Sequence, residues 1–197
     1  MLDSGISDSG WDAKLSLRFA SRGDRTEIVE RRHHGPLRIQ RPFYPEPSGT
    51  CHVYVLHPPG GVVGGDQLAL DVSVDAGAHA LLTTPAATKL YRSAGARAGV
   101  RQTLRVARGA RLEWLPHETI AFSAAHAELM TRVELAAGAR FLGWEMLCLG
   151  RPASDERFDR GEVRQSIEIE IGGKPAYCER GSYAAGDEVL SAAWGLR

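Results

Sequence analysis

The chain has 197 residues, 43% of them hydrophobic, and its 24 basic and 24 acidic side chains leave a formal net charge of zero. This composition describes a folded globular protein with one sizeable core, and the charge balance excludes a general attraction to nucleic acid or to an anionic membrane. No apolar run approaches the roughly 20 residues that span a bilayer. Residues 1–10 are polar and glycine-rich, which predicts a disordered N-terminal segment rather than a signal peptide.

Cysteine usage favours a reducing compartment. The chain carries three cysteines, Cys51, Cys148 and Cys178, and no CxxC pair. An odd and sparse set argues against a disulfide framework, so we predict a cytoplasmic protein.

Alternating apolar side chains predict β-strands in the first part of the chain. Residues 11–19, 26–30 and 51–56 each show this alternation. The stretch 31–45 mixes basic, aromatic and proline residues, and therefore cannot form a long helix.

The segment 57–66, His-Pro-Pro-Gly-Gly-Val-Val-Gly-Gly-Asp, joins two predicted strands. Proline restricts φ and glycine permits backbone angles that other residues avoid, so this segment predicts a shaped loop. The loop contains Gly60, Gly61, Gly64 and Gly65. Asp66 closes it and either lines a site or caps a turn.

A Gly-Ala motif recurs three times at nearly constant spacing. Its glycines, Gly77, Gly109 and Gly138, are 109 − 77 = 32 and 138 − 109 = 29 residues apart, and strand-like stretches flank each one. Such a repeat predicts stacked β-units, although an ordinary β-sandwich with similar hairpins is the alternative.

Two further features complete the expected fold. The only helical feature expected is one turn starting near Pro85, and residues 163–171 and 176–179 predict strands around a Gly-Gly turn. The predicted fold is therefore mainly β, with a stacked β-strand (β-helix-like) architecture and little helix, in a single domain over 11–197.

Familiar catalytic motifs are absent from the sequence. It contains no GxSxG, no GxxxxGK[ST], no HExxH and no paired-cysteine zinc spacing. Seven histidines remain, and imidazoles near carboxylates suit nickel or zinc, although scattered surface or core histidines look the same. Glu145 lies in an apolar stretch that we predict to be a strand, and Glu179 follows a similar stretch. A carboxylate there faces solvent or lines a polar interior.

Several motifs together resemble the urease accessory protein family called UreD, or UreH. They extend from about Trp11 to Trp194 and comprise Gly35-Pro36-Leu37, residues 40–45, Cys51-His52, residues 57–66, residues 84–89, Tyr91-Arg92-Ser93, residues 112–116, Glu118-Thr119, residues 147–152 and Glu179-Arg180.

The resemblance implies an assembly role rather than an enzymatic one. Family members bind the urease apoprotein and recruit a helical adaptor, UreF, and a GTPase that carries nickel, UreG. Together they help to assemble the dinuclear nickel centre of urease. The family fold is a largely β stack of strands, and its members are thought to pass nickel transiently through a polar internal channel, with no tightly bound cofactor.

Matched by motif, the channel candidates in this chain are Asp66, Thr88, Lys89, Glu145 and Glu179, with the carboxylates as tentative nickel ligands. Some relatives carry aspartate at the position of Glu145. For Lys89, a helix-surface charge is the alternative.

Family members are longer than this chain, so the resemblance implies a domain that is incomplete at its C-terminus. A stack cut in this way exposes an unpaired edge, and we expect poor solubility. Two other hypotheses stay open: a pure scaffold that takes no part in metal transfer, and a stand-alone metal-dependent enzyme using Asp66 and nearby histidines.

Overall fold

Stacked β-strands make up almost all of the regular structure in the computed structural model, which describes residues 10–195. Within that range, the only helices are two short 3₁₀ segments, Pro152–Ser154 and Glu188–Leu190. The strands are β1 (Asp12–Arg22), β2 (Arg25–His34), β3 (Arg38–Ile39), β4 (Cys51–Leu56), β5 (Gln67–Val74), β6 (His79–Thr83), β7 (Thr88–Leu90), β8 (Ala98–Val106), β9 (Arg111–Leu115), β10 (Thr119–Ala121), β11 (Ala125–Leu135), β12 (Arg140–Gly143), β13 (Leu147–Leu149), β14 (Gly161–Ile171) and β15 (Lys174–Ala184). The predicted disordered segment 1–10 lies outside the described residues except for Gly10.

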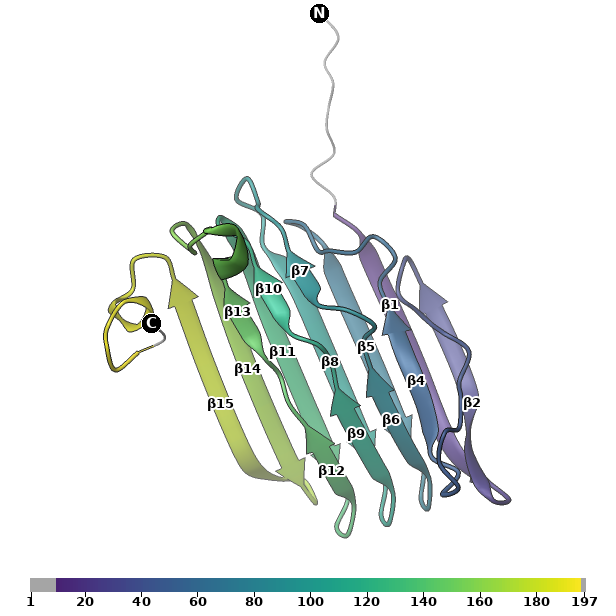
Figure 1. The fold of residues 1–197 in the computed structure, drawn as a ribbon. Coiled ribbons are helices and arrows are strands. Elements are labelled where there is room, and N and C mark those ends of the chain that lie inside the picture. The colour runs from purple at the N-terminus through teal and green to yellow at the C-terminus, as the bar shows by residue number, and fades with distance from the viewer. Residues whose placement is uncertain (1–9, 196–197) are drawn as a thin grey trace, which may run out of the picture.

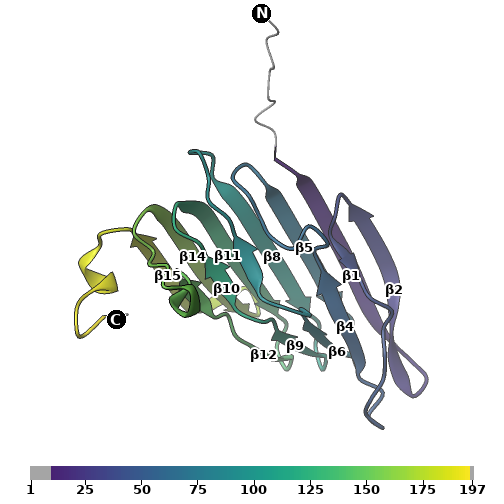
Figure 2. The same ribbon diagram turned by 45° about the horizontal axis from the view of Figure 1, so that its top comes forward.

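The strands wind into a β-solenoid of about four turns. One long sheet has the order β15-β14-β11-β8-β5-β1-β2, and it faces a five-stranded layer, β12-β9-β6-β4-β3, and a three-stranded layer, β13-β10-β7. Each central coil runs from the long sheet into the five-stranded layer and then into the three-stranded layer (Figures 1 and 2). The stacked architecture predicted from the Gly-Ala repeat is confirmed, and the β-sandwich alternative is wrong.

The Gly-Ala repeats form the corner of each coil between the long sheet and the five-stranded layer. Gly77, Gly109 and Gly138 all have positive φ, at 75°, 73° and 80°. The alanine after the glycine closes each turn: Ala78 donates its backbone N–H to the Asp75 carbonyl at 3.0 Å. Successive corners also bond to each other, since the Arg111 N–H donates to the Ala78 carbonyl at 2.9 Å. The repeat is conspicuous in the sequence because every coil needs the same positive-φ position.

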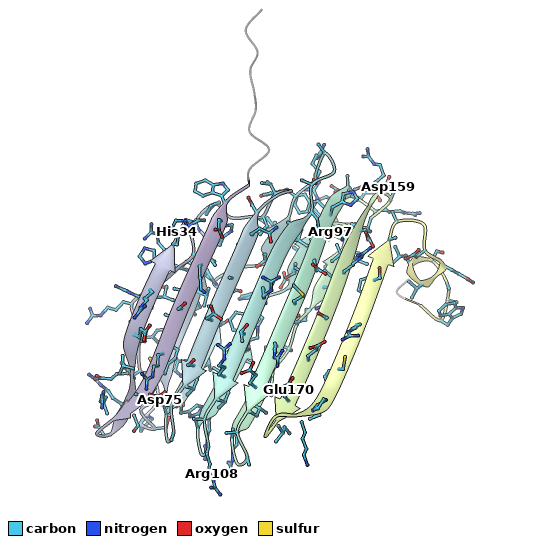
Figure 3. All side chains as sticks on the ribbon, turned by 180° about the vertical axis from the view of Figure 1, so that it is seen from behind. His34, Asp75, Arg97, Arg108, Asp159 and Glu170 are labelled. Atoms are coloured by element: carbon cyan, nitrogen blue, oxygen red, sulfur yellow. The ribbon has the colours of Figure 1, made fainter. Side chains whose placement is uncertain are left out.

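Apolar side chains fill the space between the layers. The largest fully buried ones are Phe19, Leu15, Leu82, Leu90, Leu104, Leu112, Val53, Val62, Val72, Val74, Val133 and Val163. The opposite face of the long sheet carries charged side chains, seen from behind in Figure 3. There Arg105 pairs with Glu134, and Arg132 pairs with Glu170, across neighbouring strands. This division of faces follows from the period-two alternation of strands.

The last coil differs from the others. β14 turns back through Gly172 and Gly173 into antiparallel β15 in the same sheet, and β15 is an edge strand. The facing layers end at β12 and β13, so large apolar side chains are exposed near this end: Leu142, Trp144, Met146, Ile171 and Tyr177. β15 and β2 are the two edge strands of the long sheet, and poor solubility stays a prediction.

Two local expectations are wrong. Residues 84–87 form no helical turn, and Lys89 lies in β7, because the Thr88 N–H donates to the Glu118 carbonyl at 2.9 Å in the parallel ladder with β10. Glu145 lies in the connection between β12 and β13, not in a strand. Among the described residues, no helix is long and apolar enough to cross a membrane.

Candidate functional site

The glycine loop 57–66 packs tightly against the connection that follows β7. A Cβ on Gly61 would overlap the Tyr91 ring, and a Cβ on Gly64 would overlap the Ser93 side chain. The Val62 N–H donates to the Lys89 carbonyl at 2.7 Å, so the loop is tied to β7. Gly60 and Gly65 have positive φ, at 77° and 92°. The loop is therefore shaped by its glycines, as the sequence predicts.

Asp66 fastens this loop to the first strand. Its side chain is 1% exposed, and its carboxylate accepts the Trp11 N–H at 2.7 Å and the Val63 N–H at 2.9 Å. Both oxygens are thus engaged with the backbone, which is the turn-capping arrangement left open by the sequence. A role of Asp66 in nickel transfer stays a prediction.

A partly open pocket of about 160 Å³, which we call the interior cavity, lies between the layers beside the glycine loop and reaches the surface at Gly60, Pro85 and Ala86. Three side chains that line it carry buried polar atoms for which the described residues offer no hydrogen-bond partner: His57 Nε2, Gln102 Oε1 and Trp114 Nε1. Burial lowers the pKa of His57, against the opposing effect of the nearby Asp66 charge. The imidazole is therefore held toward its neutral form, which has a lone pair available for a ligand.

Thr88 lines this cavity, as does Gly60, whereas Lys89 does not. Successive residues of a strand face opposite ways, so Lys89 faces away from the side on which Thr88 and the buried Leu90 lie. The contribution of Lys89 that the structure displays is its backbone carbonyl, which accepts the Val62 N–H. Its predicted part in a nickel channel stays a prediction.

Glu145 belongs to a second cluster of polar side chains. Its carboxylate accepts hydrogen bonds from the Thr131 hydroxyl and from Gln165 Nε2, the latter at 2.9 Å. Burial raises the pKa of Glu145, these two hydrogen bonds oppose the shift, and the charge of Glu179 adds to it. Among residues 10–195, no Lys, Arg or His forms an ion pair with Glu145.

The structure brings Glu145 and Glu179 into one neighbourhood. Thr131 pairs with Ile167, and Ile167 pairs with Glu179, in adjacent strands of the long sheet. Glu179 itself is exposed and accepts a hydrogen bond from the Tyr177 hydroxyl. The two carboxylates that the sequence singles out in apolar stretches therefore approach each other from different layers.

A row of polar side chains connects this group to the cavity. We call it the interior polar stripe: Gln102, Thr131, Glu145 and Gln165, with the exposed Glu179 at its outer end. The parallel β8–β11 ladder places Gln102 beside Thr131. From β8 to β15 the stripe crosses three strand spacings, about 14 Å. Asp66 and Lys89 lie outside it.

Sequence reasoning missed the neutral members of the stripe and of the cavity. Gln102, Thr131 and Gln165 occupy inward positions of strands whose other inward residues are apolar. A polar residue on the apolar side of an alternating strand is the signal that marks them. Trp114 gives no such signal, because a tryptophan at an inward position is an ordinary residue of a hydrophobic core.

Comparison with known proteins identifies the family. The sequence model described as UreD urease accessory protein matches residues 12–197. The chain belongs to the UreD urease accessory protein family. This membership agrees with the resemblance seen in the sequence motifs.

Relatives named urease accessory protein UreD are identical to this UreD-family chain at about half of the aligned positions. The protein from Alkalilimnicola ehrlichii is 51% identical over 188 residues, which are 95% of this chain and 64% of that relative. The protein from Pseudomonas entomophila is 53% identical over 173 residues, 88% of this chain and 62% of the relative. The chain thus spans less than two thirds of the length of these relatives.

Proposed function

We propose that this chain is a non-catalytic cytoplasmic chaperone that helps to insert nickel into urease. It binds the urease apoprotein and works with the helical adaptor UreF and the GTPase UreG. Family membership supports the link to urease, and the interior polar stripe supports a route for the metal. Nickel is the cargo in this proposal and is held only in passing.

The observation that carries the proposal is the environment of Glu145. The Glu145 side chain is half-buried, and a carboxylate withdrawn from water is costly unless a cation or hydrogen-bond donors compensate it. Thr131 and Gln165 supply two neutral donors but no positive charge. A divalent cation passing along the stripe would supply the missing charge, and Glu179 lies near enough to influence the same site.

The metal ligands available on the stripe suit transfer of Ni²⁺ rather than its retention. Carboxylate, amide and hydroxyl oxygens are weaker ligands for Ni²⁺ than thiolates or grouped imidazoles. Oxygen ligands spaced along a row let an ion exchange one partner for the next. Cys51 is buried in β4, and Cys178 faces the opposite side of β15 from Glu179 because successive strand residues alternate.

The test is urease activation in cells that carry a urease gene cluster but lack their own UreD-family gene. The 197-residue chain is supplied unchanged, as Glu145→Gln, or as Glu134→Gln. Glu134 is the matched control, because it lies on the outer face of the same strand as Thr131 and pairs with Arg105. Urease activity, nickel content of urease and co-purification with the apoprotein are measured together.

We expect the unchanged chain and Glu134→Gln to restore urease activity. Glu145→Gln should lower activity and nickel content at least tenfold while co-purification persists. Full activation by Glu145→Gln would favour the pure scaffold, in which the metal travels elsewhere. Failure of the unchanged chain to activate urease would contradict the proposal itself.

A further inference from the structure

The end of the solenoid that holds the first strands carries a positive surface. Residues 31–41 contain four arginines and two histidines but no aspartate or glutamate, although the whole chain has a net charge of zero. We call this surface the basic edge, and all of its residues are exposed: Arg31, Arg32, His33, His34, Arg38 and Arg41. Among residues 10–195, Arg32 is the one arginine of the four that forms an ion pair, with Glu30.

The positive surface coincides with an unpaired strand edge. β2 is the outermost strand of the long sheet, and β1 is its only partner strand in the described part of the chain (Figures 1 and 3). In an antiparallel pair, alternate residues of the edge strand point their backbone N–H and C=O groups away from the partner. At the start of β2 the Thr26 N–H donates to the Gly49 carbonyl at 2.9 Å, so the chain covers that part of the edge.

The uncovered part of β2 is regular strand. The register with β1 shifts at Val29, which is the extra residue of a β-bulge. From Glu30 to His34 the pairing with β1 is continuous, and within residues 10–195 this stretch forms no backbone hydrogen bond with a loop. Five strand residues span about 17 Å, which is the length of an ordinary strand. The edge can therefore accept one more strand.

The cations lie on both faces of this edge. His33 and Arg31 are paired with the buried Leu15 and Leu17, so they lie on the inner side of the sheet. Arg32 and its neighbour His34 project from the outer side, because strand residues alternate. A strand added beside β2 would thus meet positive charge on each of its faces.

The facing layer extends the positive surface across the end of the stack. β3 is the edge strand of the five-stranded layer, and Arg38 in β3 contacts His33 of β2 through Nη1 and Nε2, at 2.8 Å. A guanidinium only donates hydrogen bonds, so the imidazole nitrogen is the acceptor. The edges of the two layers are therefore joined by this hydrogen bond, and Arg38 adds its charge to the inner side.

These features restrict the partner that the edge fits. Unpaired backbone groups in a row are completed by an extended peptide, and cations on both faces favour carboxylates on both faces of that peptide. A second copy of this chain would bring the same positive charges and would be repelled. A nucleic acid would match the charge, but it lacks the repeating N–H and C=O groups of a strand.

We propose that the basic edge is a docking site for an extended acidic segment of a partner protein, which adds to the long sheet as a further strand beside β2. The backbone of the segment pairs with residues 30–34, and its carboxylates contact Arg31 and Arg38 on the inner side and Arg32 on the outer side. The inference does not depend on nickel delivery, because β2 lies four strand spacings, about 19 Å, from the strand β11 that contacts Glu145.

The test uses the purified 197-residue chain and a fluorescent eight-residue peptide of alternating Thr and Glu. Fluorescence anisotropy gives the affinity, and hydrogen exchange of the chain shows which amides the peptide protects. A peptide of the same sequence with methylated backbone nitrogens keeps the charges but cannot donate to the ladder. This second peptide tests strand addition on the unchanged chain, so the answer does not require a variant that folds.

A pair of matched triple variants tests the charges. The first replaces three arginines of the basic edge by glutamine: Arg31→Gln, Arg38→Gln and Arg41→Gln. The control replaces three exposed arginines beside the Gly-Ala corners, with the same loss of charge: Arg108→Gln, Arg111→Gln and Arg140→Gln.

We expect the acidic peptide to bind and to slow exchange of amides within residues 30–34. Affinity should fall at least tenfold for the basic-edge variant and for the methylated peptide, and less than twofold for the control variant. Absence of binding, or unchanged exchange in residues 30–34, would overturn the proposal and leave the cations as protection of β2 against self-pairing. Equally tight binding of an eight-nucleotide oligothymidylate would also overturn it, since the surface would then recognise polyanions in general.

Discussion

Gln102 of β8 and Thr131 of β11 are direct neighbours in the parallel ladder, and this pairing joins the interior cavity to the Glu145 carboxylate. Neither residue is charged, and they are 29 positions apart in the chain. Their adjacency follows from coil stacking, since equivalent positions of successive coils lie about 4.8 Å apart. The polar row changes register at β14, because Thr131 pairs there with Ile167 and the polar Gln165 pairs with Leu129.

Asp66→Asn should destabilise the protein by about 1–3 kcal/mol, the range expected when hydrogen bonds to a buried charged group are impaired. Asparagine retains one acceptor, but its NH₂ group would face one of the two N–H donors, from Trp11 or Val63. Urea unfolding of both proteins gives the difference. An unchanged midpoint would show that the capping bonds do not contribute to stability.

Gly64→Ala and Gly109→Ala should differ in severity, because their glycines are needed for different reasons. A Cβ at Gly109 meets nothing within 4 Å, so the cost comes only from its φ of 73°, about 1–2 kcal/mol. A Cβ at Gly64 would overlap Ser93 and lie 2.7 Å from the Ala96 carbonyl oxygen. Such overpacking costs about 1–3 kcal/mol or more.

Thermal and urea unfolding of the two glycine variants show which substitution destabilises the protein more. We expect Gly64→Ala to have the lower midpoint and to disturb the contact between the loop and Ser93. The reverse order would mean that the loop shifts freely, in contrast to the shaped loop described above.

Glu145 should make the protein less stable as pH rises. The pKa of this carboxyl is raised from its ordinary value of 4.5 by burial, so the folded state holds the proton more tightly than the unfolded chain does. The stabilisation is complete below pH 4.5 and is lost as pH rises through the folded-state pKa. Comparison of wild type with Glu145→Gln between pH 4 and pH 8 isolates this effect, and parallel curves would contradict it.

Glu162 should make the protein less stable as pH falls, which is the opposite of the effect of Glu145. Hydrogen bonds from Arg97 and Arg164 lower its pKa from 4.5 to about 2, so the unfolded chain binds the proton more readily. Its stabilisation is present above pH 4.5 and is lost as pH falls toward 2. The stability difference between wild type and Glu162→Gln should therefore shrink across that acidic range, as measured by unfolding at each pH. A difference that stays constant would mean that the two arginines do not hold the carboxylate.

Most of the strands could be predicted from local pattern alone. The strand 51–56 has the same limits in sequence and structure, and the predicted strand 26–30 lies within β2. The helical turn near Pro85 was mispredicted because ladder pairing of Thr88 with β10 outweighs the local tendency of proline to begin a helix. The strand that the apolar neighbours of Glu145 predict does not form, because β12 ends at Gly143.

The sequence by itself determined the β class, the stacked coils and the shaped loop, because these depend on residue alternation, on repeat spacing and on glycine at positive φ. Only the tertiary structure decided which polar residues meet. It tied Asp66 to Trp11, turned Lys89 away from the cavity, and joined Glu145 to Gln165 across 20 positions. The physical reason is that the register between coils and layers arises from packing over the whole core, and no local pattern encodes it.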